Sequence, residues 1–246
     1  MLKQGLRDAI WRHCCQHNPL LHQVGSTLGL NLPEQGWHHL VLRTFNLAPF
    51  SVDRLAPALE RLGYQFERPY RWPDLHSRAY LYSAPGQPHV IVSELQVQEL
   101  PQECRAILQG LTEQVQHLQL NEYPSPFAGR LWRNPALETI NTLQVHSEFA
   151  AWLSIWGPGP YSCGIDLSEA TAVRSLPDWQ HFWQAQTQTR LHHLRESDWL
   201  LLHSAGISQP SPGGDERQVA GAPIVLVNGA GTFHLPESVL TARDWL

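Results

Sequence analysis

The sequence predicts an α+β fold in which a strand–helix–strand–strand–strand unit occurs twice, with helices joining the two units. Two observations predict it. The alternating run WHHLVLRTF is followed by a helical pattern and three more strand-like runs, and after Trp156 the same order of patterns returns. Between the units, two long stretches carry apolar residues at helical spacing. We therefore expect residues 1–246 to form a single compact domain, with a first module at 32–100, a helical connection at 101–156 and a second module at 157–246.

The first unit follows a predicted helix over Leu2–Gln16. In the strand that begins at Trp37, alternation places one set of side chains on one face, namely His39, Val41 and Arg43. His38 should point to the other face. Ser51 is a candidate cap for a helix that ends before Gly63. The runs YQFERPY, RAYLYS and HVIVSEL then predict three strands.

The second half begins with two predicted helices, over Pro101–Leu120 and Pro135–Trp156. YSCGIDL predicts a strand, and Ser175 with Asp178 is a candidate cap for the next helix. RLHHLRE, WLLLHSA and APIVLV predict further strands, and SQPSPGGDERQ predicts a flexible loop. The end, LPESVLTARDWL, fits either a short strand or a helix.

Composition and charge argue against a nucleic-acid-binding protein and against a membrane protein. The net charge is −5, and the 17 Lys and Arg residues are spread along the 246-residue chain, so we expect no nucleic-acid partner. No apolar run approaches the roughly 18 residues that span a bilayer, and the charged N-terminus does not resemble a signal peptide. The four cysteines lack a CxxC spacing and favour reduced thiols in a cytoplasmic protein.

Three motifs of the first half resemble a known family: HLVLRTF from His39, RLGY from Arg61 and PHVIVSEL from Pro88. They are similar to the 2-oxoadipate dioxygenase/decarboxylase (hydroxyglutarate synthase) family of the vicinal-oxygen-chelate fold. SEFAAWLSIWG, WLLLHS and the later Leu-Pro resemble its second half more weakly. This resemblance implies two βαβββ modules, of the glyoxalase-like kind, curved around one cleft.

The resemblance also implies a chemistry. Family enzymes are expected to hold Fe(II) with two histidines and one glutamate, a ligand set that leaves positions open for a 2-oxo acid and O2. His39 matches the first ligand. Arg43 matches the arginine expected to hold the carboxylate of a small 2-oxo dicarboxylic acid, and a guanidinium fork suits a carboxylate.

The second half departs from the family pattern. The position of the second histidine falls at or near Ser162, and that of the glutamate at or near Thr241. Neutral hydroxyls are poor Fe(II) donors beside imidazole and carboxylate. His203 is the candidate replacement ligand. Glu94 is a candidate for a second layer around the site, although a structural hydrogen bond is the interpretation that we favour for it.

Two functions follow. In the first, the protein is an Fe(II)-dependent 2-oxo acid dioxygenase/decarboxylase that converts a 2-oxo dicarboxylic acid to a shorter 2-hydroxy acid. In the alternative, it is a divergent relative without iron that binds a small acid or a protein partner. Each residue also has a structural alternative: His39 as a core or surface histidine, and Arg43 in a salt bridge with a nearby carboxylate.

Overall fold

The computed structural model describes residues 4–17, 20–32, 34–115, 129–170, 191–193, 199–202, 207–210, 216–219 and 224–227. Two helices precede the sheet, α1 (Gln4–His17) and α2 (Leu21–Leu28). The sequence predicted the first and missed the second. In the described part of the chain, no helix is long and apolar enough to cross a membrane.

The first βαβββ unit is confirmed element by element. It consists of β1 (Trp37–Phe45), α3 (Val52–Arg61), β2 (Gln65–Trp72), β3 (Ser77–Ser83) and β4 (His89–Leu95). β1 pairs in parallel with β4, and β3 pairs antiparallel with both β2 and β4.

The start of α3 is held differently from the predicted cap. The Ser51 side chain makes no capping hydrogen bond. Instead, the Val52 backbone N–H donates to Glu94 Oε1 on β4 over 2.8 Å, and Gln96 Nε2 donates to Glu94 Oε2 over 2.9 Å. A carboxylate at a helix N-terminus satisfies an orphan amide and complements the helix dipole. Glu94 therefore fastens α3 to the sheet.

The described part of the helical connection contains three helices, α4 (Gln102–Glu113), α5 (Leu137–His146) and α6 (Glu148–Trp156). The single helix expected over Pro135–Trp156 is wrong, because the chain breaks at Ser147. This residue is extended (φ −160°, ψ 110°), and its side chain accepts a hydrogen bond from Ala150 N. Ser147 therefore caps α6, and the chain changes direction at this residue between α5 and α6.

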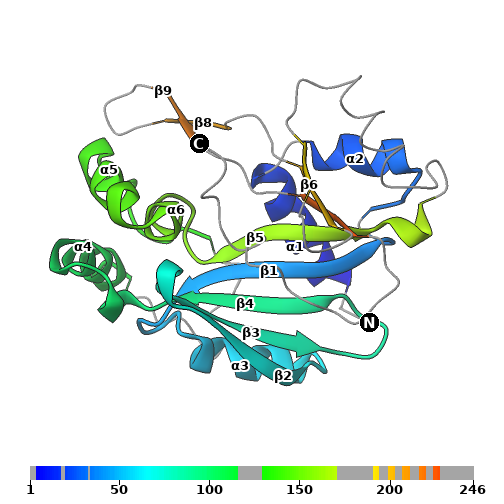
Figure 1. The fold of residues 1–246 in the computed structure, drawn as a ribbon, viewed down its shortest axis with the longest axis horizontal. Helices are drawn as coiled ribbons and strands as arrows, with labels where there is room; N and C mark the ends of the chain where they lie inside the picture. Colours follow the sequence, from blue (N-terminus) through cyan, green and yellow to red (C-terminus); the bar gives the residue numbers. More distant parts are fainter. Residues whose placement is uncertain are drawn as a thin grey trace.

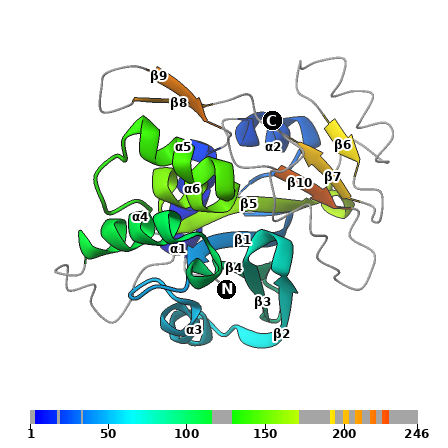
Figure 2. The same ribbon diagram turned by 60° about the vertical axis from the view of Figure 1, so that its left-hand side comes forward.

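The second module repeats the pairing of the first. The eight-stranded sheet has the order β2-β3-β4-β1-β5-β10-β7-β6, with β5 (Gly159–Asp166), β6 (Leu191–His193), β7 (Trp199–Leu202) and β10 (Ile224–Val227). Counted outward from the central antiparallel pair β1–β5, each half has a parallel neighbour and then an antiparallel one. β1 and β5 lie side by side in Figure 1, and Figure 2 shows β10 and β7 beyond β5. The strands that begin near Trp37 and near Tyr161 therefore occupy equivalent places in the two modules, as expected if the unit occurs twice.

Part of the second module differs from the sequence prediction. The stretch expected as a flexible loop forms, at its ends, a hairpin of β8 (Ile207–Pro210) and β9 (Glu216–Val219). The helix expected near Ser175 and the C-terminal element lie outside the described residues.

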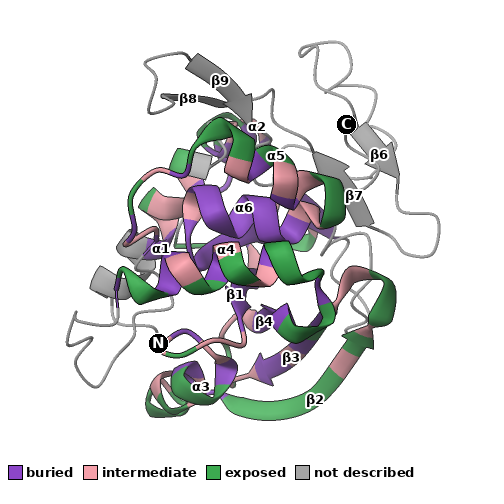
Figure 3. Ribbon diagram, turned by 90° about the vertical axis from the view of Figure 1, so that its left-hand side faces the viewer, coloured by how far each residue is buried: buried purple, intermediate pink, exposed green. Residues whose placement is uncertain are grey.

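The two faces of the sheet pack against different helices. Val41 and Phe45 of β1 belong to the core that includes α4, α5 and α6, whereas Leu40 and Leu42 belong to the core that includes α1, α2 and α3. Figure 3 shows α6 buried along most of its length, next to α4 and α5, while β2 at the sheet edge is largely exposed. We call the face of the sheet that packs against α4, α5 and α6 the helix-pair face, after the pair of helices α5 and α6.

Candidate active site on the helix-pair face

Strand register places Arg43 in the middle of a row that crosses the sheet. Arg43 pairs with Ser93 on β4 and Gly159 on β5, Ser93 pairs with Ala79 on β3, and Ala79 pairs with Tyr70 on β2. Paired residues point to the same face of a sheet. Small residues therefore flank Arg43 and leave room for its long side chain.

The Arg43 guanidinium is held by a carboxylate from α6. Arg43 is 1% exposed, and its two terminal nitrogens donate to the two carboxylate oxygens of Glu148 over 3.0 and 3.1 Å. This is a fork-to-fork ion pair, the strongest geometry for these groups. The salt bridge that the sequence left open as the alternative for Arg43 is present, and its partner is Glu148.

Three aromatic rings surround the same guanidinium. Arg43 Cζ lies 3.4 Å from the Tyr161 ring centroid, 4.4 Å from that of Phe149 and 5.3 Å from that of Trp152. The negative faces of such rings stabilise a desolvated cation. Burial raises the pKa of Tyr161 well above its ordinary value, so the phenol is neutral beside the ion pair.

His39 lies on the same face, farther along β1. It is fully buried, pairs with Gly164 on β5, and packs its ring against that glycine so closely that a side chain there would collide with it. His39 Nδ1 lies 2.9 Å from His38 Nδ1. The expectation that His38 points away is therefore wrong, because the β1–β5 register shifts between Trp37 and His39. A bulge of this kind changes the strict alternation of side chains.

Both imidazoles are neutral at ordinary pH. Burial lowers the pKa of His39 well below its usual value, and the neighbouring His38 and His89 lower it further. Burial also lowers the pKa of His38, against the opposing effect of Asp166. In the contact between two neutral rings, one Nδ1 donates and the other accepts. A neutral imidazole is the form that binds a metal or accepts a proton.

Ser162 stands between His39 and Arg43, since it pairs with Val41 on the same face. It is 2% exposed, and its hydroxyl makes no hydrogen bond to another group that the structure describes. The same is true of the hydroxyls of Ser77, Ser93 and Tyr70. Register places these three on the helix-pair face too. Buried hydroxyls without a protein partner normally bind a water or a ligand.

The described residues do not by themselves fit Fe(II). Among them, no three His, Cys, Asp or Glu side chains come together as a metal-binding group. His39 offers one imidazole, and Ser162, the position matched to the second family histidine, offers a hydroxyl. His203 and Thr241 lie outside the described residues. Glu94 faces α3, because it pairs with Thr44 on the opposite side of β4 from Ser93.

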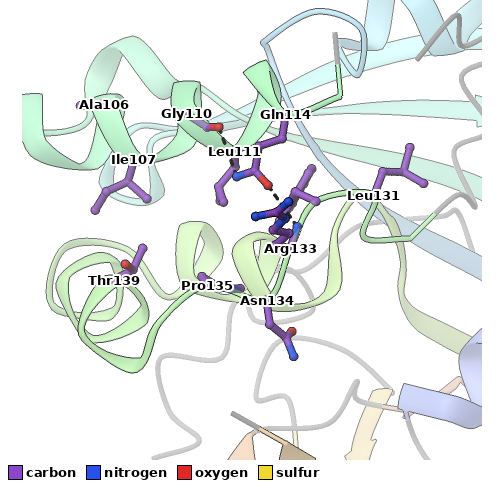
Figure 4. Close-up of a pocket in the computed structure, with 11 residues that line it drawn as sticks. Ala106, Ile107, Gly110, Leu111, Gln114, Leu131, Arg133, Asn134, Pro135 and Thr139 are labelled. Atoms are coloured by element: carbon purple, nitrogen blue, oxygen red, sulfur yellow. Dashed lines mark hydrogen bonds between the residues drawn. The ribbon is translucent and has the colours of Figure 1, made fainter. Parts of the chain in front are cut away.

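A separate groove lies between α4 and α5 (Figure 4). It has a volume of about 790 Å³ and is lined by Ala106, Ile107, Gly110, Leu111, Gln114, Leu131, Trp132, Arg133, Asn134, Pro135 and Thr139. Neither His39 nor Arg43 contributes to it. The helix-pair face of the sheet, with its buried ion pair and hydroxyls, is therefore the candidate active site.

Glu148, Phe149 and Trp152 were not predicted from the sequence to be part of this site. Glu148 is 105 positions from Arg43 in the chain, and no local pattern links the two. The available signal was the Ser-Glu pair at the start of α6, which is typical of a helix N-terminus.

Known proteins resemble this chain in sequence. No family model matches the chain. A 2-oxoadipate dioxygenase/decarboxylase of rice, chloroplastic/amyloplastic, is 25% identical over 192 residues, which cover 72% of this chain and 50% of that protein. The chloroplastic enzyme of the same name from Arabidopsis thaliana is 25% identical over 135 residues, 49% of this chain and 36% of that protein. The chain resembles the 2-oxoadipate dioxygenase/decarboxylases. It spans about half the length of the rice relative.

Solved structures share the fold. The crystal structure of a protein named as a hydrolase, from Shewanella frigidimarina, superposes on this chain with a TM-score of 0.79 at 21% identity, over 92% of each chain. Rice hydroxyglutarate synthase in complex with 2-oxoadipate gives 0.69 at 19% identity, over 92% of this chain and 82% of that one. A glyoxalase-superfamily protein from Ralstonia eutropha gives 0.65 at 15% identity, over 91% and 81%. The predicted α+β, vicinal-oxygen-chelate-like fold and the predicted resemblance are both confirmed.

Proposed function

We propose that this protein binds a small 2-oxo dicarboxylic acid on the helix-pair face and acts as a 2-oxo acid dioxygenase/decarboxylase. The overall reaction would consume one 2-oxoadipate and one O2 and give one 2-hydroxyglutarate and one CO2. Support comes from the similarity to proteins named for this activity and from the 2-oxoadipate in the rice structure.

The observation that carries the proposal is the Arg43 site. A buried arginine on the same face as a buried, neutral histidine is suited to an anionic ligand, because its fork matches a carboxylate in charge and shape. The hydroxyls of Ser93 and Ser162, which bind no other group that the structure describes, lie beside it and could donate to keto or carboxylate oxygens. Tight binding of a dicarboxylate needs several such groups together.

The cofactor is part of the same proposal. If the protein is active, Fe(II) is expected, with His39 as one ligand and His203 as the candidate replacement. Two neutral hydroxyl positions, Ser162 and Thr241, favour a second function: a relative without iron that binds a small acid or a protein partner. A cytoplasmic location is also proposed, and the free thiols of Cys14, Cys15, Cys104 and Cys163 support it.

One experiment separates these functions. The protein is purified anaerobically without chelators and supplied with Fe(II), and bound iron and 2-oxoadipate-dependent O2 uptake are measured. Binding of 2-oxoadipate to the metal-free protein is measured in parallel by calorimetry. Stoichiometric iron with formation of 2-hydroxyglutarate supports the enzyme. Binding of 2-oxoadipate without iron or O2 uptake supports the metal-free relative. Absence of both binding and turnover refutes a 2-oxo acid function.

A further inference from the structure

We propose that Glu148 is the specificity-determining residue of the Arg43 site, an internal carboxylate that a ligand carboxylate must displace in order to bind. This inference rests on the proposed function, since it takes Arg43 as the ligand-binding group. Its starting point is geometric: Glu148 already makes with Arg43 the two parallel hydrogen bonds, of 3.0 and 3.1 Å, that a ligand carboxylate would make.

The site holds one carboxylate at a time at these two nitrogens. Tyr161 covers the guanidinium at 3.4 Å and Phe149 lies at 4.4 Å, so a second anion cannot stack on the cation. The Arg43 side chain is fully buried. Placing a second carboxylate beside Glu148 would bring two like charges together in a desolvated site, which is costly. A ligand carboxylate must therefore replace Glu148 and cannot join it.

The Glu148 side chain can swing out into solvent, whereas the Arg43 side chain cannot. The Glu148 side chain is 20% exposed, against 0% for Arg43, so it has a path to water. The first turn of α6 does not depend on it, because Ser147 accepts the capping hydrogen bond from Ala150 N. A carboxylate in the first turn of this nine-residue helix stays favourably placed when it swings outward. Exchange also keeps the buried guanidinium neutralised throughout.

The need to displace Glu148 selects ligands by the number of polar contacts that they make in the site. A simple monocarboxylate gains at Arg43 only what Glu148 already supplies, so exchange gives it no advantage. A 2-oxo dicarboxylate brings further oxygens, which can accept hydrogen bonds from buried hydroxyls such as those of Ser93 and Ser162. Glu148 thereby restricts the site to ligands that bind through more than one polar group.

The test compares four proteins by calorimetry on the metal-free chain: wild type, Glu148→Gln, Arg43→Ala and Glu103→Gln. Glu103 is the matched control, because it is another carboxylate that pairs with a basic side chain, His146 over 2.8 Å, but at an exposed position. The ligands are 2-oxoadipate and the monocarboxylate 2-oxobutyrate. We expect Glu148→Gln to bind 2-oxoadipate at least about tenfold more tightly than wild type and to gain measurable 2-oxobutyrate binding. Glu103→Gln should match wild type, and Arg43→Ala should bind neither acid.

Each result decides the proposal. Unchanged or weaker 2-oxoadipate binding in Glu148→Gln, with binding lost in Arg43→Ala, would make Glu148 a structural support and overturn this inference while the proposed function stands. If Arg43→Ala binds as well as wild type, or no variant binds, the site assignment fails and the inference falls with it. Thermal unfolding shows whether each variant is folded, and Glu148→Ala serves as a second variant if Glu148→Gln is not.

Discussion

Replacing Gly164 with alanine tests the packing that holds His39 in place. Gly164 lies on the central strand β5, paired with His39 on one side and Val225 on the other. A Cβ added here would overlap Nδ1 and Cε1 of the His39 ring and lie 2.9 Å from its Cγ. The ring cannot easily retreat, since it is fully buried and its Nδ1 contacts His38.

The expected cost follows from two opposing effects. Overpacking a well-packed core by one methyl group costs about 1–3 kcal/mol. Replacing glycine at an ordinary strand conformation stabilises a protein by about 0.4–1 kcal/mol through the unfolded chain. We therefore expect Gly164→Ala to lower the free energy of unfolding by about 1–2 kcal/mol. Equilibrium urea unfolding measures this change.

Gly110 provides the matched control. It lies within helix α4, and a Cβ added there meets nothing within 4 Å. Gly110→Ala should raise stability by about 0.5–1 kcal/mol, because alanine is the better helix former. The same glycine-to-alanine substitution should therefore change the free energy of unfolding in opposite directions at the two sites.

A double-mutant cycle then assigns the cost to the ring. In a His39→Ala background the methyl group at position 164 finds open space, so most of the penalty should disappear, with a coupling energy of about 1–3 kcal/mol. If Gly164→Ala is as stable as Gly110→Ala, or if its penalty survives removal of the His39 ring, the ring does not lie over Gly164 and the packing argument is refuted.

Three further predictions concern other parts of the molecule. Arg43→Ala should weaken binding of a 2-oxo dicarboxylate by about 2–4 kcal/mol in a titration, because a charge-assisted bidentate contact is lost; unchanged affinity would contradict the role of Arg43. Glu94→Ala should lower the free energy of urea unfolding by about 1–2 kcal/mol through the lost cap on Val52 N, and an effect within error would show that water replaces the carboxylate. Burial lowers the pKa of His13 from 6.5 to about 4. Since the unfolded chain binds the proton first, stability should fall as pH drops from about 6.5 to 4 and level off below. His13→Gln should flatten this pH dependence, and an identical profile in the variant would refute the assignment.

The first module was predictable because its signals are local. Alternation over Trp37–Phe45 places His39 and Arg43 on one face, and turn residues separate the next three strands. The break between α5 and α6 was missed although its signal was present. Apolar residues continue at helical spacing through Ser147, and that pattern outweighed the cap formed by Ser147 itself.

The site was only half predictable, because its other half depends on tertiary contacts. The orientation of His38 is set by a bulge that arises from pairing with β5, about 125 residues later in the chain. The partner of Arg43 comes from a helix 105 positions away. Strand periodicity specifies which face a side chain takes, but not which group from a distant element will meet it there.

The two proposed functions make different demands on the His39 end of the helix-pair face and the Arg43 end. At about 3.3 Å per residue, the Cα atoms of His39 and Arg43 lie about 13 Å apart along β1. Binding of a small acid, with or without iron, needs Arg43 to accept a carboxylate, whereas only the dioxygenase needs metal ligands near His39. Substitutions more than about 7–10 Å apart that share no partner usually act independently. Arg43→Ala should therefore remove acid binding whether or not iron is present. His39→Ala should spare acid binding by the metal-free protein while removing any iron, and loss of acid binding in that variant would show that the two ends form one inseparable site.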